Sequence, residues 1–108
     1  MPKFKAKADR NQPEIVKALR DAKASVQHLH AVGAGCPDIL VCFRNVLYLM
    51  EIKDGSKPPS QRKLTPDQVK WHENWCGDVH VVKSVDEALA VIGLHHGLVN
   101  IPLVGTIK

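Results

Sequence analysis

The stretch GCPDILVCFRNVLYLMEIKDG, residues Gly35 to Gly55, decides the fold of this chain of 108 residues. Two apolar runs, 39–43 and 46–53, flank the dipeptide Arg44-Asn45, and this pattern predicts two strands joined by a hairpin turn. In an antiparallel hairpin the start of the first strand lies beside the end of the second. The charged residues near the two ends of the stretch are therefore expected to meet at the open end of the hairpin.

Three charged side chains occupy that open end. Asp38 begins the first strand and is expected opposite or near Glu51, which lies close to the end of the second. Because side chains alternate along a strand, Glu51 and Lys53 are expected on one face, and Met50 and Ile52 on the other. The hairpin therefore brings two carboxylates and an ammonium group together at one end of a sheet.

Apolar periodicity and helix-capping residues predict further elements on both sides of the hairpin. The predicted order is helix, strand, hairpin, helix, strand, helix, which gives an α/β fold with a mixed sheet flanked by helices. Before the hairpin, we expect a helix over 12–23 capped by Asn11 and a strand over 25–30. After the hairpin, we expect a helix from Thr65 to about Trp75 with a Thr65–Gln68 capping box, followed by a strand over 79–83. The last helix begins with a second capping box, Ser84 and Glu87, and ends before Gly93.

Composition limits the classes of protein to which the chain can belong. With 44% hydrophobic residues, a net charge of +4 and a pI near 9.1, it is a folded, mildly basic chain, compatible with a polyanionic partner. Its three cysteines contain no CxxC pair, and no apolar run reaches the ~20 residues of a membrane span. We expect a cytoplasmic protein without a membrane partner. It has a basic arm over 1–10, one domain over 11–93, and an apolar tail over 94–108 that is a candidate dimer contact.

The charged cluster predicts a metal site. Two carboxylates held close together repel each other unless a cation lies between them, and Mg²⁺ prefers oxygen ligands while keeping several waters. Asp38, Glu51 and the backbone carbonyl of Ile52 form a suitable ligand set, and Lys53 could position a water made nucleophilic by the ion. An ordinary surface salt bridge between Lys53 and either carboxylate is the alternative.

These residues also resemble a known family. Pro37-Asp38 followed by Glu51-Ile52-Lys53 looks like the PD-(D/E)xK signature of restriction-endonuclease-like nucleases. More narrowly, residues 11–92 resemble the small stand-alone VRR-NUC nucleases, many of them carried by phages. Glu14 in NQPEIVKAL matches an acidic residue of that family, and Gln68 in TPDQVKWHENW matches a glutamine on the helix after the E-x-K strand.

The resemblance implies metal-dependent hydrolysis of a DNA phosphodiester on an α-β-β-β-α-β core. Mg²⁺, with Mn²⁺ as a substitute, would be held by Asp38 and Glu51, and by Glu14 directly or through water. Lys53 would orient the attacking water, and Gln68 would steady the site or reach the DNA backbone. Gln68 is also the capping-box residue, and one amide is not expected to serve both purposes easily.

Several further readings follow from the residues and the resemblance. The basic loop residues Lys57, Arg62 and Lys63 flank the site and could grip phosphates, although they could also form a solvated loop. The small size of the chain favours a homodimer, because one protomer offers one active site. The family resemblance links such small nucleases to the cutting of branched DNA such as four-way junctions. A binding module that holds DNA without cutting it is the competing hypothesis.

Two residue sets support weaker predictions. The six histidines and three cysteines match no structural zinc spacing, so core or surface positions are expected for them. Trp71 and Trp75 lie four residues apart on one helix face; they could stack on exposed bases, but a core role is favoured.

Overall fold

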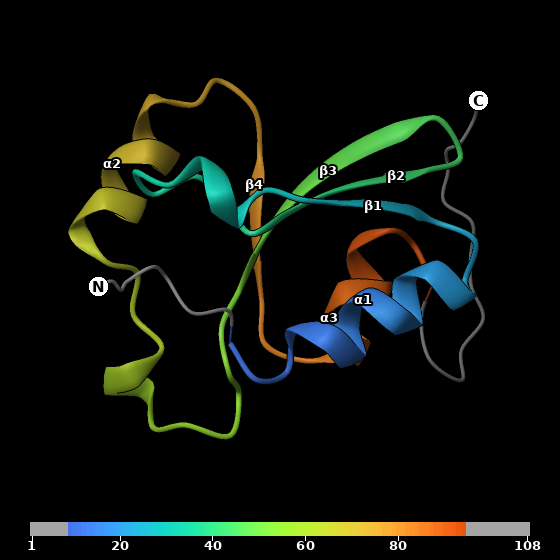
Figure 1. Cartoon of the computed structure of the whole chain (residues 1–108), viewed down its shortest axis with the longest axis horizontal. Helices are drawn as coiled ribbons and strands as arrows, with labels where there is room; N and C mark the ends of the chain where they lie inside the picture. Colours follow the sequence, from blue (N-terminus) through green and yellow to red (C-terminus); the bar gives the residue numbers. More distant parts are fainter. Residues whose placement is uncertain (1–8, 95–108) are drawn as a thin grey trace.

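The computed structural model describes residues 9–94 of the chain (Figure 1). The predicted order of helices and strands is confirmed. The elements are α1 (Gln12–Asp21), β1 (Ser25–His28), β2 (Ile39–Phe43), β3 (Val46–Ile52), α2 (Pro66–Asn74), β4 (Val79–Val82) and α3 (Val85–Val91), with short 3-10 turns at His30–Val32 and Pro59–Gln61. The four strands form one sheet in the order β1-β2-β3-β4. β3 and β4 run parallel, and the other two pairs are antiparallel, so the sheet is mixed as predicted.

The two predicted elements nearest the N-terminus are shorter than expected. Lys23 has a φ of 78°, a left-handed conformation that a helix cannot continue through, and α1 accordingly ends at Asp21. β1 ends at His28 rather than at residue 30, because a 3-10 turn over His30–Val32 follows it. Both differences arise from local backbone conformations that hydrophobic periodicity does not encode.

The turn between β2 and β3 sets the register of the hairpin. Arg44 and Asn45 both have positive φ, 52° and 69°, as in the two-residue turns whose twist matches that of paired strands. Pairing runs from Phe43–Val46 to Ile39–Met50. One step further, the Asp38 amide donates to the Met50 carbonyl at 3.1 Å, so Asp38 enters the hairpin beside Glu51. The predicted meeting of the two carboxyl-bearing residues is therefore confirmed.

The hydrophobic core lies on one face of the sheet. In Figure 1, α1 and α3 lie together beneath that face, and α2 lies away from them on the other side. Each fully buried aliphatic side chain contributes about 1.5–3 kcal/mol relative to an exposed one. The core consists of Ile15, Val16, Leu19, Ala24, Ile39, Val41, Phe43, Met50, Ile52, Val82, Ala88 and Ile92.

Strand alternation assigns the other face of the sheet to a different set of side chains. Leu47, Leu49 and Glu51 of β3 point away from Met50 and the core. Leu47 is 65% exposed, so this face is only partly covered by the described residues. The carboxylate site therefore lies on the less covered face, where a large ligand can approach it.

Asn11 precedes α1, but its side chain makes no capping hydrogen bond, contrary to expectation. Its Nδ2 instead donates to the carbonyl oxygens of Lys53 at 3.0 Å and of Lys83 at 3.1 Å. The side chain thus ties the start of α1 to the residues that follow β3 and β4. This contact holds the segment with Lys53 against the rest of the domain.

The two helices predicted with capping boxes differ. Thr65 and Gln68 form the full reciprocal pair, as predicted. Ser84 accepts from the Glu87 amide, but the Glu87 carboxylate accepts from the amide of Lys83 at 2.8 Å, one residue before the cap, so the second box is only half formed.

Most of the predicted basic arm, 1–10, and nearly all of the apolar tail, 94–108, lie outside the described residues. The proposed dimer contact from Leu98 to Ile107 therefore has no structural description. Leu94, where the description ends, packs against the hydrophobic core. Within residues 9–94, no helix is long and apolar enough to cross a bilayer.

Candidate active site

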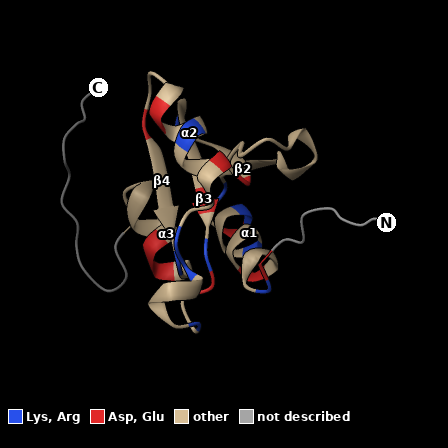
Figure 2. Cartoon of the chain, turned by 90° about the vertical axis from the view of Figure 1, so that its left-hand side faces the viewer, with Lys and Arg blue, Asp and Glu red and all other residues tan. Residues whose placement is uncertain are grey.

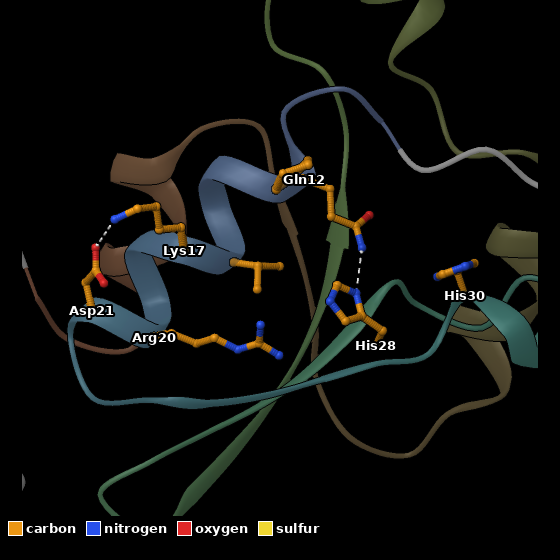
Figure 3. Close-up of a pocket in the computed structure, with 8 residues that line it drawn as sticks. Gln12, Lys17, Arg20, Asp21, His28 and His30 are labelled. Carbon is orange, nitrogen blue, oxygen red and sulfur yellow. Dashed lines mark hydrogen bonds and ion pairs between the residues drawn. The ribbon is translucent and has the colours of Figure 1, made fainter.

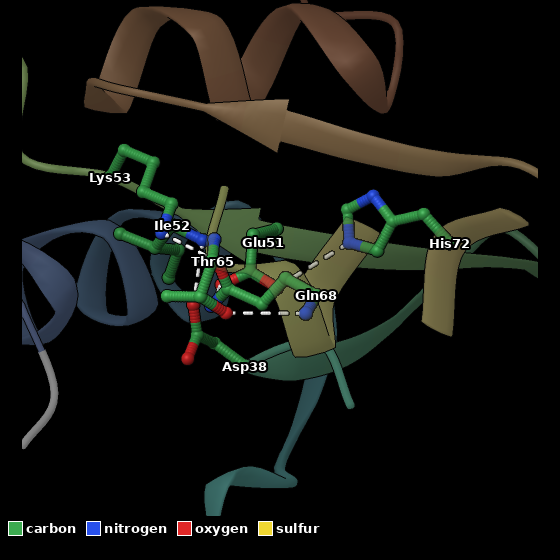
Figure 4. A network of polar contacts seen from close by, with 7 residues as sticks. All are labelled: Asp38, Glu51, Ile52, Lys53, Thr65, Gln68 and His72. Atoms are coloured by element: carbon green, nitrogen blue, oxygen red, sulfur yellow. Dashed lines mark hydrogen bonds and ion pairs between the residues drawn. The ribbon is translucent and has the colours of Figure 1, made fainter. Parts of the chain in front are cut away.

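The two carboxylates at the open end of the hairpin lie in different environments (Figure 4). Asp38 is half-buried, and its Oδ2 accepts a hydrogen bond from the Ile52 amide at 2.7 Å. Glu51 is only 1% exposed, and its Oε1 has no hydrogen-bond partner among the described residues. Burial raises the pKa of Glu51 to about 9, and the nearby Asp38 carboxylate adds to this rise while Lys53 opposes it. A nearby cation would stabilise the charged form of this buried carboxyl group.

Gln68 connects the hairpin to α2. Its Nε2 donates to Glu51 Oε2 at 2.9 Å, while its Oε1 accepts from both the Lys53 ammonium, at 2.8 Å, and the Thr65 amide, at 2.9 Å. The expectation that capping and cleft roles compete is therefore wrong. An amide oxygen accepts two hydrogen bonds while the amide nitrogen donates elsewhere, so one side chain serves both.

Lys53 is held by this network rather than by a carboxylate. Its partner is the Gln68 oxygen, and among residues 9–94 the ion pairs found do not join Lys53 to Asp38 or Glu51. The alternative reading of a simple surface salt bridge therefore does not describe the observed contacts. The ammonium group keeps further donors with which it could bind a water or a phosphoryl oxygen.

His72 is a site residue that the sequence analysis did not identify. It lies four residues after Gln68 on α2, and its Nε2 is 3.6 Å from Glu51 Oε1. Neither atom has a hydrogen-bond partner within residues 9–94, and the His72 side chain is only 16% exposed. Burial lowers the pKa of His72, and Lys53 lowers it further, so the ring is neutral near pH 7. The i, i+4 spacing from Gln68 was the signal available in the sequence.

The structure does not bring Glu14 to the carboxylate pair. Glu14 is exposed on α1 and lines a separate cleft of about 400 Å³, together with Asn11, Asp54, Gly55, Ser56, Lys83, Ser84 and Glu87. The reason is helical geometry: Ile15 and Val16 turn into the core, which leaves Glu14 on the outer side of the first turn.

Asp9 is the N-terminal carboxylate that acts on this site. It is half-buried, and burial raises its pKa, an effect that Lys53 opposes and Asp38 reinforces. Its charge also contributes to the raised pKa of Glu51. The sequence analysis placed Asp9 in the basic arm, because a single acidic residue before a helix cap carries no motif.

The donor set fits a hard divalent cation. Within the described part of the chain no three His, Cys, Asp or Glu residues are grouped as a metal site would require, so the protein supplies a carboxylate pair rather than a closed cage. Mg²⁺ tolerates this because it retains several waters. The partnerless Oε1 of the buried Glu51 is the observation that fits, since a cation beside Asp38 and Glu51 would satisfy it. The Ile52 carbonyl remains a predicted ligand.

The three basic residues predicted to bind DNA differ in exposure. Lys57 and Lys63 are exposed, whereas Arg62 is half-buried and its Nε is buried without a partner. Figure 2 looks onto this side of the molecule and shows basic and acidic positions gathered between α1, α2 and α3. The loop therefore exposes two ammonium groups, Lys57 and Lys63, for which the ion pairs found within residues 9–94 include no partner.

A separate cavity of about 560 Å³ lies between α1 and β1 (Figure 3). Gln12, which is 3% exposed, points at His28, with 3.2 Å between Nε2 and Nδ1, and Lys17 pairs with Asp21 at 2.8 Å. The cavity is lined by none of the carboxylate-site residues. Its polar side chains are largely committed to one another.

The fold and the site together define a class. A mixed α/β sheet that presents an aspartate, an E-x-K triplet and a glutamine from the next helix has the arrangement of a restriction-endonuclease-like nuclease domain. The chain is similar to a solved structure described as a VRR_NUC domain, with a TM-score of 0.56 and 25% sequence identity. The match covers 76% of this chain and 94% of that one. No family model and no curated protein matches. This likeness, which covers most of both chains, supports a VRR-NUC nuclease domain as the class to which the fold and the site pattern point.

Proposed function

We propose that the protein is a metal-dependent DNA endonuclease that uses Mg²⁺, or Mn²⁺ in its place. The observation that carries the proposal is the buried Glu51 beside Asp38, with a carboxylate oxygen that no group of residues 9–94 satisfies. A bound ion would polarise a phosphate oxygen and lower the pKa of a water. Asp38 and Glu51, with the Ile52 carbonyl, are the proposed ligands.

The other residues of the network have distinct proposed roles. Lys53 directs its ammonium group toward the attacking water or the developing phosphoryl charge, which preorganised donors stabilise best. Gln68 hydrogen-bonds to both Lys53 and Glu51, so it is a positioning residue that sets the distance between the Lys53 ammonium group and the Glu51 carboxylate. Hydrolysis breaks the P–O bond to the leaving strand, and the water supplies the new P–O bond and the proton that the leaving oxygen gains.

Branched DNA and a homodimer are the finer parts of the proposal. One protomer of this size offers one carboxylate site, and two paired sites would cut two strands. Lys57 and Lys63 supply phosphate contacts beside the site. Ultracentrifugation at micromolar concentration tests the dimer, and a monomer bound to a four-way junction would contradict it.

The test is cleavage of linear duplex, single-stranded, flap and four-way-junction DNA with Mg²⁺, Mn²⁺ or EDTA. We expect metal-dependent cutting that Asp38→Ala and Lys53→Ala abolish while their circular dichroism spectra stay unchanged. Glu14→Gln and Asp9→Asn form a matched pair, and the second is expected to weaken the response to Mg²⁺ more. If neither the wild-type protein nor any variant cuts DNA but all of them bind it, the alternative of a catalytically silent binding module is correct.

A further inference from the structure

The two tryptophans of the chain form a stacked pair outside the hydrophobic core. Their ring centroids are 4.7 Å apart with an interplanar angle of 21°, and Trp75 is 46% exposed. Neither ring belongs to the core cluster, so the core role favoured by the sequence is wrong. Stacking one indole on the other leaves a wide aromatic surface that the described residues do not cover.

Cavities lie against this pair. One, of about 470 Å³, is walled by Trp71 and Trp75 and has a largely apolar lining that includes Leu29, Leu40, Leu47 and Leu49. A second cleft, of about 360 Å³, also contacts both rings and includes Lys70 and Asn74 of α2. The apolar slot, faced by aromatic rings, suits a flat ligand with an apolar face. The Lys70 ammonium group in the second cleft suits an anionic group attached to that ligand.

The slot and the carboxylate site are built on the same two elements, β3 and α2. Leu47, Leu49 and Glu51 alternate onto one face of β3, so the slot floor at Leu49 lies about 7 Å from Glu51 along the strand. Trp71 follows Gln68 by one helical turn, and Gln68 touches Glu51. A nucleotide strand with a phosphate at the carboxylates would therefore have the slot close beside it.

We propose that the Trp71–Trp75 stack binds an unpaired nucleobase of the DNA substrate, next to the phosphate to be cut. The proposal rests on the proposed function and names its substrate class: DNA with unpaired bases at the cleavage point. Bases stack on aromatic side chains whatever their sequence, because every base presents a π-face. Lys70, in the second cleft, holds a backbone phosphate, and the slot holds the base.

Intrinsic fluorescence tests this directly, because the chain contains two tryptophans and both are in the stack. Titration in EDTA prevents cutting and separates binding from catalysis. We expect a single-stranded oligonucleotide to quench the emission, and an abasic strand of equal length and charge to quench it far less. Trp75→Leu should bind the single strand about tenfold more weakly, whereas Trp75→Phe should keep most of the affinity. Val69→Ala, exposed on the same helix, is the control.

The outcomes separate the two proposals. Equal quenching by the abasic strand, or unchanged affinity of Trp75→Leu at an unchanged melting temperature, would overturn base binding even if the enzyme cuts DNA. Emission that shifts with protein concentration in the absence of DNA would show that a second copy covers the stack, and would also overturn it. Base-dependent quenching without cutting in any metal would sustain base binding by the stack but refute the nuclease, and with it the placement beside a phosphate to be cut.

Discussion

At the residue scale, the contacts of the site converge on Glu51. Gln68 donates to one of its oxygens, His72 approaches the other, and Asp38 lies beside it. None of these neighbours carries a full positive charge against it, and Lys53 is held by Gln68 instead. The carboxyl group is therefore more easily kept neutral than charged until a cation arrives.

The raised pKa of Glu51 predicts how stability depends on pH in metal-free protein. Its ordinary value is 4.5 and its folded value about 9, so between these pH values the folded protein holds a proton that the unfolded chain has lost. The free energy of unfolding should therefore fall as pH rises through this range. Urea unfolding in EDTA measures the slope, and Glu51→Gln should flatten it. An equal slope in both proteins would contradict the burial argument.

Replacement of His72 should weaken the response of cutting to Mg²⁺, to an extent that depends on whether the new side chain can donate a hydrogen bond. The 3.6 Å between His72 Nε2 and Glu51 Oε1 is longer than a hydrogen bond, and a small movement on metal binding would let a ring protonated on Nε2 donate to Glu51, as outer-shell partners do for many metal ligands. His72→Leu keeps the bulk but removes the donor, and should raise the Mg²⁺ concentration for half-maximal cutting by about tenfold. His72→Gln should recover part of the loss. If Leu and Gln behave alike, the contact is only packing.

At the element scale, the loop before β2 fixes where α2 begins. Gly35 has a φ of +86°, and a Cβ built there would overlap the backbone carbonyl of Asp67 in the first turn of α2. The loop and the helix are therefore in direct backbone contact. This contact helps to place Gln68 and His72 against the sheet, since no residue of α2 is itself fully buried.

Gly35→Ala should displace α2 as well as strain the backbone. We expect a stability loss of about 2 kcal/mol or more, and loss of cutting per folded molecule, because Gln68 and His72 move with the helix. Gly33→Ala is the matched control, since Gly33 also has positive φ but nothing lies within 4 Å of its added Cβ. It should lose stability while keeping its activity. Retained cutting by Gly35→Ala would show that the helix position is not set by this contact.

Asn11 provides a second test of how elements are joined. Its amide satisfies the carbonyls of Lys53 and Lys83, so Asn11→Ala leaves both without this donor and should cost about 1–3 kcal/mol. Asn11→Asp should cost more, because it replaces the donor with a negative charge. Urea denaturation measures both. A loss of only a few tenths of a kcal/mol in each would show that water replaces the amide readily.

At the scale of the whole molecule, the order of the elements and the meeting of Asp38 and Glu51 were predictable, because hydrophobic periodicity and strand register determine them. Strand alternation and the Arg44-Asn45 turn were enough to place Asp38 beside Glu51 and to order the elements. Contacts that depend on how separate elements pack were not predictable. His72 reaches Glu51, and Trp75 stays outside the core, only because α2 docks as it does on the less covered face of the sheet.

The positive charge of the surface predicts how DNA affinity depends on salt concentration. The chain carries +4, and each lysine that neutralises a B-DNA phosphate contributes about 0.9 to the slope of log affinity against log salt concentration. Replacing Lys57 and Lys63 by Gln should reduce that slope by about 2 in duplex binding measured in EDTA. Lys17→Gln is the control, since Lys17 already pairs with Asp21 at 2.8 Å on α1, remote from the basic loop. A double variant with the wild-type slope would place the phosphate contacts on other cations of the chain.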